Sequence, residues 1–358
     1  MCMNNILPAI GGGGFDIDPL TALLSGCGNA DIIAGMTASA LAVSPGTPGR
    51  IRSLNPMRDL SAVADLVELC FKSTMDRDGR RYLQDMRRSA TDSAFLRWAS
   101  KTSDSISLPL NGYVWEDNGR IIGNVSLIPY NRRNKHVYLI ANVATHPDFR
   151  RRGIGRMLTN TAMKHAGDKH ADEIWLHVRE DNPGAITLYE DLGFRERYRR
   201  TTYHSSSSTP ILQAPQGTQI RPRRTADWAE QSTWLERLHP QGISWYYSNF
   251  WNVLKPGMMN SLGNFLADVN VDHWTAWRAG EMHSTASVVY GRDRVDVLWV
   301  AAAPDGTDEA LHAMLARIRS SIDSRRGLLL DYPAHQSEDA IRAAGFALHR
   351  TLLWMKAE

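Results

Sequence analysis

The sequence predicts an α/β protein of the α+β type, in which one arrangement of strands and helices occurs twice along the chain. Its 358 residues exceed the usual size of one domain. Hydrophobic residues make up 43% of the chain, which is sufficient for folded cores. The order of strand-like and helix-like segments after residue 50 also repeats in the second half, which indicates an internal repeat.

Local patterns define the first copy. Residues 57–71 carry apolar side chains at helical spacing. Asn118 and Gly119 lie at the centre of a turn typical of a hairpin. The expected elements are strand 50–54, helix 57–71, one or two helices in 79–98, strands 113–116, 120–129 and 137–145, a helix from about residue 153, strand 174–178, a helix that starts at Pro183 and ends at Gly193, and a strand from 194.

The second copy follows a segment rich in serine and proline. Residues 204–217 contain four consecutive serines and two prolines, which is typical of a linker. We therefore expect a poorly ordered leader at 1–49, a first domain at 50–203, a linker at 204–217 and a second domain at 218–358. The expected elements of the second domain are strand 218–221, helix 226–238, strands 274–278, 284–290 and 294–301, helix 311–322, strand 328–331, helix 337–344 and a strand ending near 355.

Charge and cysteine content exclude several classes of protein. The net charge is only +3, so there is no overall nucleic-acid signature. An alternative, nucleic-acid binding through the arginines of 195–200 and 221–224, is disfavoured because such runs are usually solvated surface. Three cysteines without paired spacing favour a cytoplasmic protein. No apolar run is long enough for a membrane span.

Residues 143–156 are the most informative stretch. A strand leads into a basic turn with Gly153 and Gly155, and a helix follows. The first N–H groups of a helix lack partners within the helix, and the helix dipole adds positive charge there. The two glycines allow an anion to approach the backbone. The residues predict a pyrophosphate site, although the turn matches neither a P-loop nor a dinucleotide fingerprint.

Two motifs in this region resemble those of one family. The run Arg150-Arg-Arg-Gly153-Ile-Gly155 is similar to the acetyl-CoA signature of the GCN5-related N-acetyltransferases (GNAT). The run from Asn182 through Ala185, Leu188, Tyr189, Gly193 and Phe194 matches a second motif of that family. The resemblance covers about residues 50–203. It implies two tandem acyl-CoA N-acyltransferase folds, each with a mixed, mostly antiparallel sheet flanked by helices.

The resemblance also implies a reaction. In this family the amine of an acceptor attacks the thioester of acetyl-CoA directly, in a ternary complex and without a metal. The acceptor would be a small-molecule or peptide amine, and no nucleic-acid or membrane partner is expected. The protein would be a monomer or a homodimer. The implied cofactor-binding residues are Val143, Ala144, Thr145, Arg150, Arg151, Arg152, Gly153, Ile154, Gly155, Arg156, Asn182 and Tyr189.

Catalytic roles follow from the same resemblance. Tyr189 is the candidate general acid for the CoA thiolate, and the alternative is a tyrosine packed in the core. Asn182 either contacts the pantetheine arm or caps a helix. A kink near Asn142 would separate strand 137–145 from strand 174–178 and open a slot for the cofactor. Backbone N–H groups there would polarise the thioester oxygen.

The general base is less sharply defined by the sequence. His177 is the first candidate, since histidine titrates near neutral pH and its side chain would face away from that of Leu176. His146, His136, Glu116 and a water held by a backbone carbonyl are alternatives. Asn142 occupies a place where a carboxylate base is expected.

The second copy lacks the phosphate turn. At the corresponding place the chain reads Ala303-Pro-Asp-Gly-Thr-Asp-Glu309, whose acidic side chains would repel a pyrophosphate. Ile341 replaces Tyr189 when both copies are counted from their glycines. We therefore expect a degenerate, non-catalytic second domain. Two functional alternatives remain, a CoA-binding regulatory or scaffold module without turnover and an enzyme resembling the mycothiol synthases, which also have tandem domains.

Overall fold

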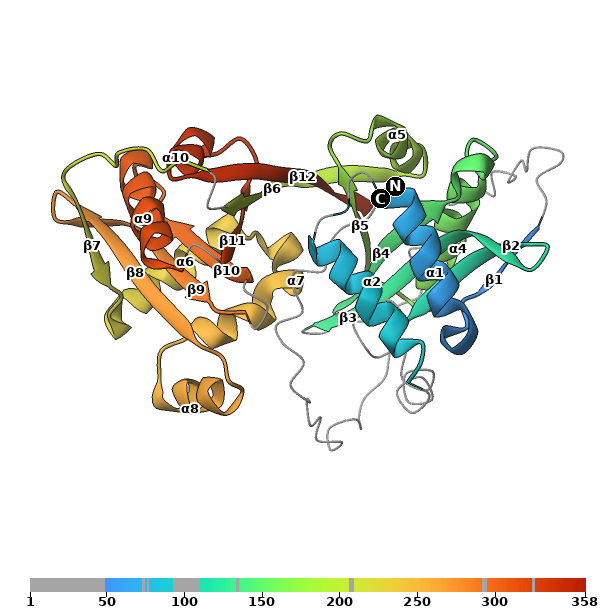
Figure 1. Cartoon of the computed structure of the whole chain (residues 1–358), viewed down its shortest axis with the longest axis horizontal. Helices are drawn as coiled ribbons and strands as arrows, with labels where there is room; N and C mark the ends of the chain where they lie inside the picture. The colour runs from blue at the N-terminus through green and yellow to red at the C-terminus, as the bar shows by residue number, and fades with distance from the viewer. Residues whose placement is uncertain are drawn as a thin grey trace.

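The computed structural model describes residues 49–72, 75, 77–92, 110–132, 135–205, 209–291, 295–323 and 326–358. The expected leader, except Gly49, and the end of the expected helix at 93–98 lie outside these residues. Figure 1 shows two halves, each with helices on its sheet. A single 12-stranded sheet runs through both, in the order β1-β2-β3-β4-β5-β12-β6-β11-β10-β9-β8-β7.

The first half contains six of these strands. Its elements are β1 (Arg50–Ser53), α1 (Pro56–Phe71), α2 (Arg77–Ser89), β2 (Asn111–Asp117), β3 (Arg120–Arg132), β4 (Lys135–Thr145), η1 (Pro147–Phe149), α4 (Ile154–Asp168), β5 (Glu173–Arg179), α5 (Pro183–Asp191) and β6 (Phe194–Ser205). The predicted hairpin turn between β2 and β3 is confirmed, because Asn118 and Gly119 both have positive φ, as that turn requires.

The second half repeats the order with additional helices. Its elements are β7 (Thr218–Pro222), η2 (Thr225–Asp227), α6 (Trp228–Leu238), α7 (Gln241–Trp251), η3 (Asn252–Leu254), α8 (Met258–Leu266), β8 (Val271–Arg278), β9 (Glu281–Val289), β10 (Val295–Ala302), α9 (Asp308–Ser321), β11 (Gly327–Pro333), α10 (Glu338–Ala343) and β12 (Phe346–Ala357). Helices α7 and α8 were not expected from the sequence.

The halves exchange their last strands. β6 closes the first half along the chain, and β12 closes the second. In space, β12 lies between β5 and β6, and β6 lies between β12 and β11. The two strands therefore cross from one half to the other side by side (Figure 1). The two sheets implied by the family resemblance are continuous for this reason.

Strand directions confirm a mixed, mostly antiparallel sheet. Among the described residues, the parallel pairs are β4 with β5 and β10 with β11. These pairs occupy equivalent places in the two halves. Their crossover connections contain α4 and α9, as parallel strands require a long connection.

Four hydrophobic clusters hold helices on the sheet. In the first half α4 and α5 cover one face, and α1 and α2 pack on the other. In the second half α9 and α10 share one cluster. Helix α7 joins the halves, because its buried side chains pack with residues of β3, β4, β10 and β12. Figure 1 shows α7 between the halves, with α2 across from it.

Trp354 tests the strand exchange. Its side chain is 1% exposed and packs against His177 of β5 and against Tyr246 and Tyr247 of α7. We expect Trp354→Ala to lower the free energy of unfolding by about 3–5 kcal/mol, because a large buried ring is lost. Leu348→Ala is the matched control, since Leu348 lies on the same strand and is 42% exposed. Urea denaturation measures both, and equal small losses would contradict the importance of this contact.

Candidate functional site

Strands β4 and β5 part at a bulge in β4. On β3 only Val125 lies between Asn124 and Ser126, whereas on β4 both Asn142 and Val143 lie between their partners. Asn142 has φ +51°, in the left-handed region. Pairing between β4 and β5 ends at Ile140 and Leu176. The kink predicted near Asn142 is therefore confirmed.

We call the region beyond this point the strand fork. It comprises Ala141–Thr145 of β4 and His177–Arg179 of β5. The β5 arm of the fork keeps a full set of strand partners on its other side, because His177–Arg179 pair with Leu352–Trp354 of β12. A strand exchanged from the second half therefore holds one side of the fork in place.

The predicted phosphate turn follows the β4 arm. Gly153 occupies the N-cap of α4 with φ +79°, and a Cβ there would meet nothing within 4 Å. The first turn of α4 contains no acidic residue. Its N–H groups and the helix dipole thus favour an anion. Arg151 also has positive φ, at +63°.

The arginines of the turn are differently engaged. Arg150 donates from Nε to the carbonyl oxygen of Thr145 at 3.3 Å. Arg152 lies over the Phe149 ring. Arg156 forms a 2.6 Å ion pair with Asp191 of α5. Both partners of that pair are about half exposed, so it contributes little to stability, and exchange for a phosphate would cost little.

Tyr189 lies on the α4 and α5 face of the fork. Its side chain is 1% exposed and contacts the Phe194 ring edge to face. It belongs to the same buried cluster as Val143 and Ile154. The structure thus brings together residues that are 46 positions apart along the chain, from β4 and α5. Asn182 caps α5, where its Oδ1 accepts from the Ala185 N–H at 3.3 Å.

His177 lies on the opposite face, among aromatic rings. The Trp354 ring centroid is 3.6 Å away, and Tyr246 of α7 contacts it edge to face. Burial, with a smaller contribution from the charge of Arg350, lowers the pKa of the His177 imidazole to about 3. Such an imidazole is neutral at pH 7 and binds a proton weakly, far from the pKa that suits a general base.

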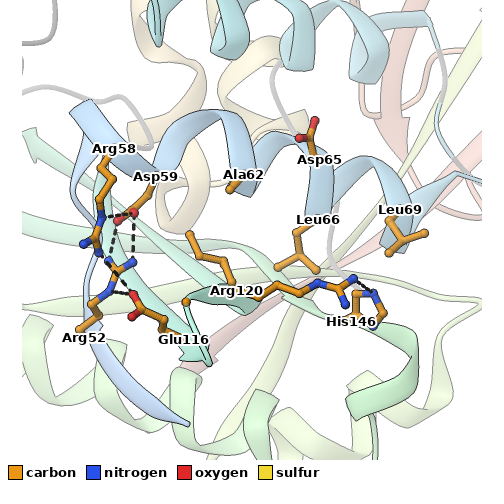
Figure 2. A pocket seen from close by; sticks show the side chains of 12 residues that line it. Arg52, Arg58, Asp59, Ala62, Asp65, Leu66, Leu69, Glu116, Arg120 and His146 are labelled. Carbon is orange, nitrogen blue, oxygen red and sulfur yellow. Dashed lines mark hydrogen bonds and ion pairs between the residues drawn. The ribbon is translucent and has the colours of Figure 1, made fainter.

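A cavity of about 530 Å³ is lined by Glu116 and His146, two of the alternative general bases. Figure 2 shows it beneath α1, between an ion-pair network and the end of β4. Its lining includes no residue of the strand fork. Glu116 accepts from Arg52, and that hydrogen bond lowers the pKa of the carboxyl group. His146 Nε2 lies 2.7 Å from an Arg120 nitrogen. Both side chains thus already interact with arginine side chains.

His136, the remaining alternative, is at the far end of the strand. It lies at the start of β4, whereas the phosphate turn follows the end of this strand. At ~3.3 Å per residue, the two ends are roughly 30 Å apart. The His136 Nδ1 also lies 3.1 Å from the Lys169 carbonyl oxygen. This position separates His136 from the fork.

Sequence reasoning missed a polar cluster around Asn142. The Asn142 Nδ2 donates to the Tyr82 hydroxyl at 2.9 Å and lies 3.3 Å from Ser126 Oγ. The Asn124 Nδ2 donates to the Asn142 carbonyl oxygen at 3.0 Å. Asn124 within the apolar β3 run was the one available signal, whereas Tyr82 comes from α2 and requires the tertiary fold.

The corresponding place in the second half has a different chemistry. β10 pairs with β9 without a bulge. Helix α9 is capped by Thr307, whose side chain accepts from the Ala310 N–H, and Asp308 and Glu309 lie in its first turn. Acidic side chains there disfavour a bound phosphate. Of the two equivalent helices, α4 begins without an acidic residue in its first turn, whereas α9 begins with two.

Two further properties concern other kinds of site. Among the described residues, no group of three or more His, Cys, Asp or Glu side chains is arranged to hold a metal ion. In the same part of the chain, no helix has the length and apolar character needed to cross a membrane.

The buried imidazole makes stability depend on pH. Because the folded-state pKa of His177 is about 3 and the unfolded value is about 6.5, protonation favours the unfolded state. The contribution of the neutral His177 to the free energy of unfolding is present above pH 6.5 and is lost as the pH falls toward 3. We expect wild type to lose about 2–3 kcal/mol more than His177→Gln between pH 7 and pH 4.5. Urea denaturation at both pH values measures this, and parallel losses would refute it.

Part of the chain is similar to known acetyltransferases. Residues 75–194 match the family model described as the acetyltransferase (GNAT) family. The [ribosomal protein bS18]-alanine N-acetyltransferase of Salmonella typhimurium (strain LT2) is 42% identical over 66 residues, which are 18% of this chain and 45% of that protein. The chain thus matches less than half of that relative's length.

Two solved structures resemble most of the chain. A GCN5-related N-acetyltransferase from Sphaerobacter thermophilus aligns with a TM-score of 0.55 at 16% identity, covering 87% of this chain and 97% of that one. A tandem GNAT protein from the clavulanic acid biosynthesis pathway aligns with a TM-score of 0.50 at 15% identity, covering 86% and 98%. At these identities the likeness concerns the fold alone. Residues 75–194, which contain the kinked strand and the glycine turn, thus form a domain that matches the GNAT acetyltransferase family.

Proposed function

We propose that this protein transfers an acetyl group from acetyl-CoA to a primary amine by direct attack in a ternary complex. The observation that carries the proposal is the strand fork, which leads directly into a helix terminus suited to an anion. Acetyl-CoA has a pyrophosphate and an extended pantetheine arm, so its shape and charge match this arrangement.

The cofactor contacts follow the chain. The backbone of Val143, Ala144 and Thr145 would run beside the pantetheine as an added strand. The turn from Arg150 to Arg156 would cradle the pyrophosphate through backbone N–H groups and positive charge. Asn182 would order the start of α5, consistent with its bond to the Ala185 N–H.

The reaction requires one bond to form and one to break. The amine nitrogen attacks the thioester carbonyl carbon, the C–N bond forms, and the C–S bond breaks as the CoA thiolate leaves. The Val143 N–H would stabilise the negative charge that develops on the carbonyl oxygen. Tyr189 would donate its proton to the thiolate, a transfer that its dry surroundings favour.

The amine must also lose a proton. His177 is the base proposed from the sequence, and its lowered pKa means that it would contribute only weakly. A water held by a backbone carbonyl would share this task. The contribution of His177 is therefore expected to be much smaller than that of Tyr189.

The halves are proposed to differ in role. Residues 50–203 would carry the chemistry, and residues 218–358 would form a non-catalytic partner, with 204–217 between them. This second half is still required, because β12 completes the sheet beside the fork. The acceptor is proposed to be a small-molecule or peptide amine. The similarity to an enzyme named for acetylating an alanine of a ribosomal protein supports testing peptide α-amines first.

Cofactor binding is the first test. We expect calorimetry to detect acetyl-CoA binding by wild type and Tyr189→Phe, and a Kd at least tenfold higher for Gly153→Glu. A glutamate at this helix terminus would repel the pyrophosphate. Gly153→Ala is the matched control, since it introduces the same left-handed backbone strain without the charge. Absence of binding by wild type would refute the proposal.

Turnover separates the two catalytic candidates. With a peptide that has a free α-amine as acceptor, we expect Tyr189→Phe to lower kcat by about 10²-fold or more, the usual contribution of a general acid. His177→Gln should lower kcat by less than about tenfold. A scaffold without turnover would give no product from any amine with wild type, and equal losses in both variants would contradict these roles.

A further inference from the structure

The polar cluster at the bulge suggests that buried side chains fix the orientation of one peptide group. Asn124 is fully buried on β3, and its Nδ2 donates to the carbonyl oxygen of Asn142 across the strand gap at 3.0 Å. The contact therefore fixes the carbonyl of the Asn142–Val143 peptide toward β3.

The other end of this peptide group must point the opposite way. In a trans peptide, the carbonyl of one residue and the N–H of the next lie on opposite sides of the chain, and the described residues contain no cis peptide. β3 and β5 flank β4 on opposite sides. A carbonyl of Asn142 held toward β3 thus directs the N–H of Val143 toward β5, into the strand fork.

A second contact braces the same residue from a helix. The Asn142 side chain is buried, and its Nδ2 donates to the hydroxyl of Tyr82 on α2. Asn142 has φ +51°, a conformation that costs energy for a residue with a side chain and persists only when its surroundings hold it. Asn124 and Tyr82 supply that support from two different elements.

We propose that Asn124 is a positioning residue for acetyl transfer, which aims the Val143 N–H at the thioester carbonyl oxygen, and that Tyr82 braces the same bulge from α2. The inference rests on the proposed function. It assigns a task to two residues that lie outside the motifs of the sequence, and neither touches the reacting atoms.

The test compares two cofactor analogues that differ at one atom group. Acetyl-CoA has the carbonyl oxygen, whereas S-ethyl-CoA has a methylene in its place and cannot accept a hydrogen bond there. We expect wild type to bind acetyl-CoA about tenfold more tightly by calorimetry, as one aligned hydrogen bond allows. In Asn124→Leu, which has a similar shape but no donor, this preference should fall to about one, with S-ethyl-CoA affinity unchanged within about twofold.

Two milder variants keep the test interpretable if Asn124→Leu folds poorly. Tyr82→Phe removes only the hydroxyl and should reduce the preference about threefold. Ser126→Ala leaves the bond from Asn124 to the Asn142 carbonyl in place but removes a hydroxyl that accepts from Asn142 Nδ2 at 3.3 Å and from Asn124 Nδ2 at 3.4 Å, so its preference should stay closer to wild type than that of Asn124→Leu. The kcat should fall in parallel with the preference in each variant.

The outcomes separate the positioning of the Asn142–Val143 peptide by Asn124 and Tyr82, which we call the clamp, from the proposed function. A preference retained in both Asn124→Leu and Tyr82→Phe overturns the clamp, and so does an equal loss of affinity for both analogues, which indicates a merely structural role. Wild type that binds both analogues equally also overturns it, while cofactor binding stands. Wild type that binds neither analogue overturns the proposed function and the clamp together.

Discussion

The exchange of β6 and β12 is the constraint on which the rest of the structure depends. At the fork, the pairing of β5 with β4 ends at Leu176, so the next residues of β5 need a strand partner on their other edge to stay in the sheet. β12 supplies that partner along His177–Arg179. Buried backbone groups must be paired, so a strand of the second half allows β4 to diverge while β5 stays in the sheet.

The exchange is symmetric, and the symmetry shows how the halves differ. Trp354 of β12 lies opposite His177 of β5, and Thr202 of β6 lies opposite Asp331 of β11. His177 and Asp331 therefore occupy equivalent positions. Asp331 forms an ion pair with buried Arg200, whose other donors reach the Leu238 carbonyl and His239. A buried charge needs such partners, and here groups of the second half satisfy the guanidinium that β6 brings into it.

Local patterns account for most of what the sequence predicted. The hairpin at Asn118-Gly119, the glycine turn before α4 and the Pro183 start of α5 each depend on neighbouring residues, and each is confirmed. The family motifs also span short stretches.

Long-range features could not be found in this way. Ile243, Tyr246 and Tyr247 of α7 follow helical spacing, but no local signal shows that this helix packs against both halves. The partner of a strand has no local signal either, and β6 and β12 read alike whether or not they are exchanged. Tyr82 and Asn124 meet Asn142 only after the sheet and α2 are assembled.

The two faces of β4 at the fork are chemically distinct, and under the proposed reaction this difference has a use. Val143 belongs to the cluster of α4 and α5, which also contains Tyr189. Asn142 binds Tyr82 of α2 on the other face, the face on which α7 also packs. A leaving thiolate would meet its proton donor on the first face, while the amine approaches from the polar second face. At the bulge, Asn142 and Val143 both lie opposite a single residue of β3. The thiolate side and the amine side of the reaction would therefore meet at the same level of β4. Direct transfer between two bound substrates requires this proximity.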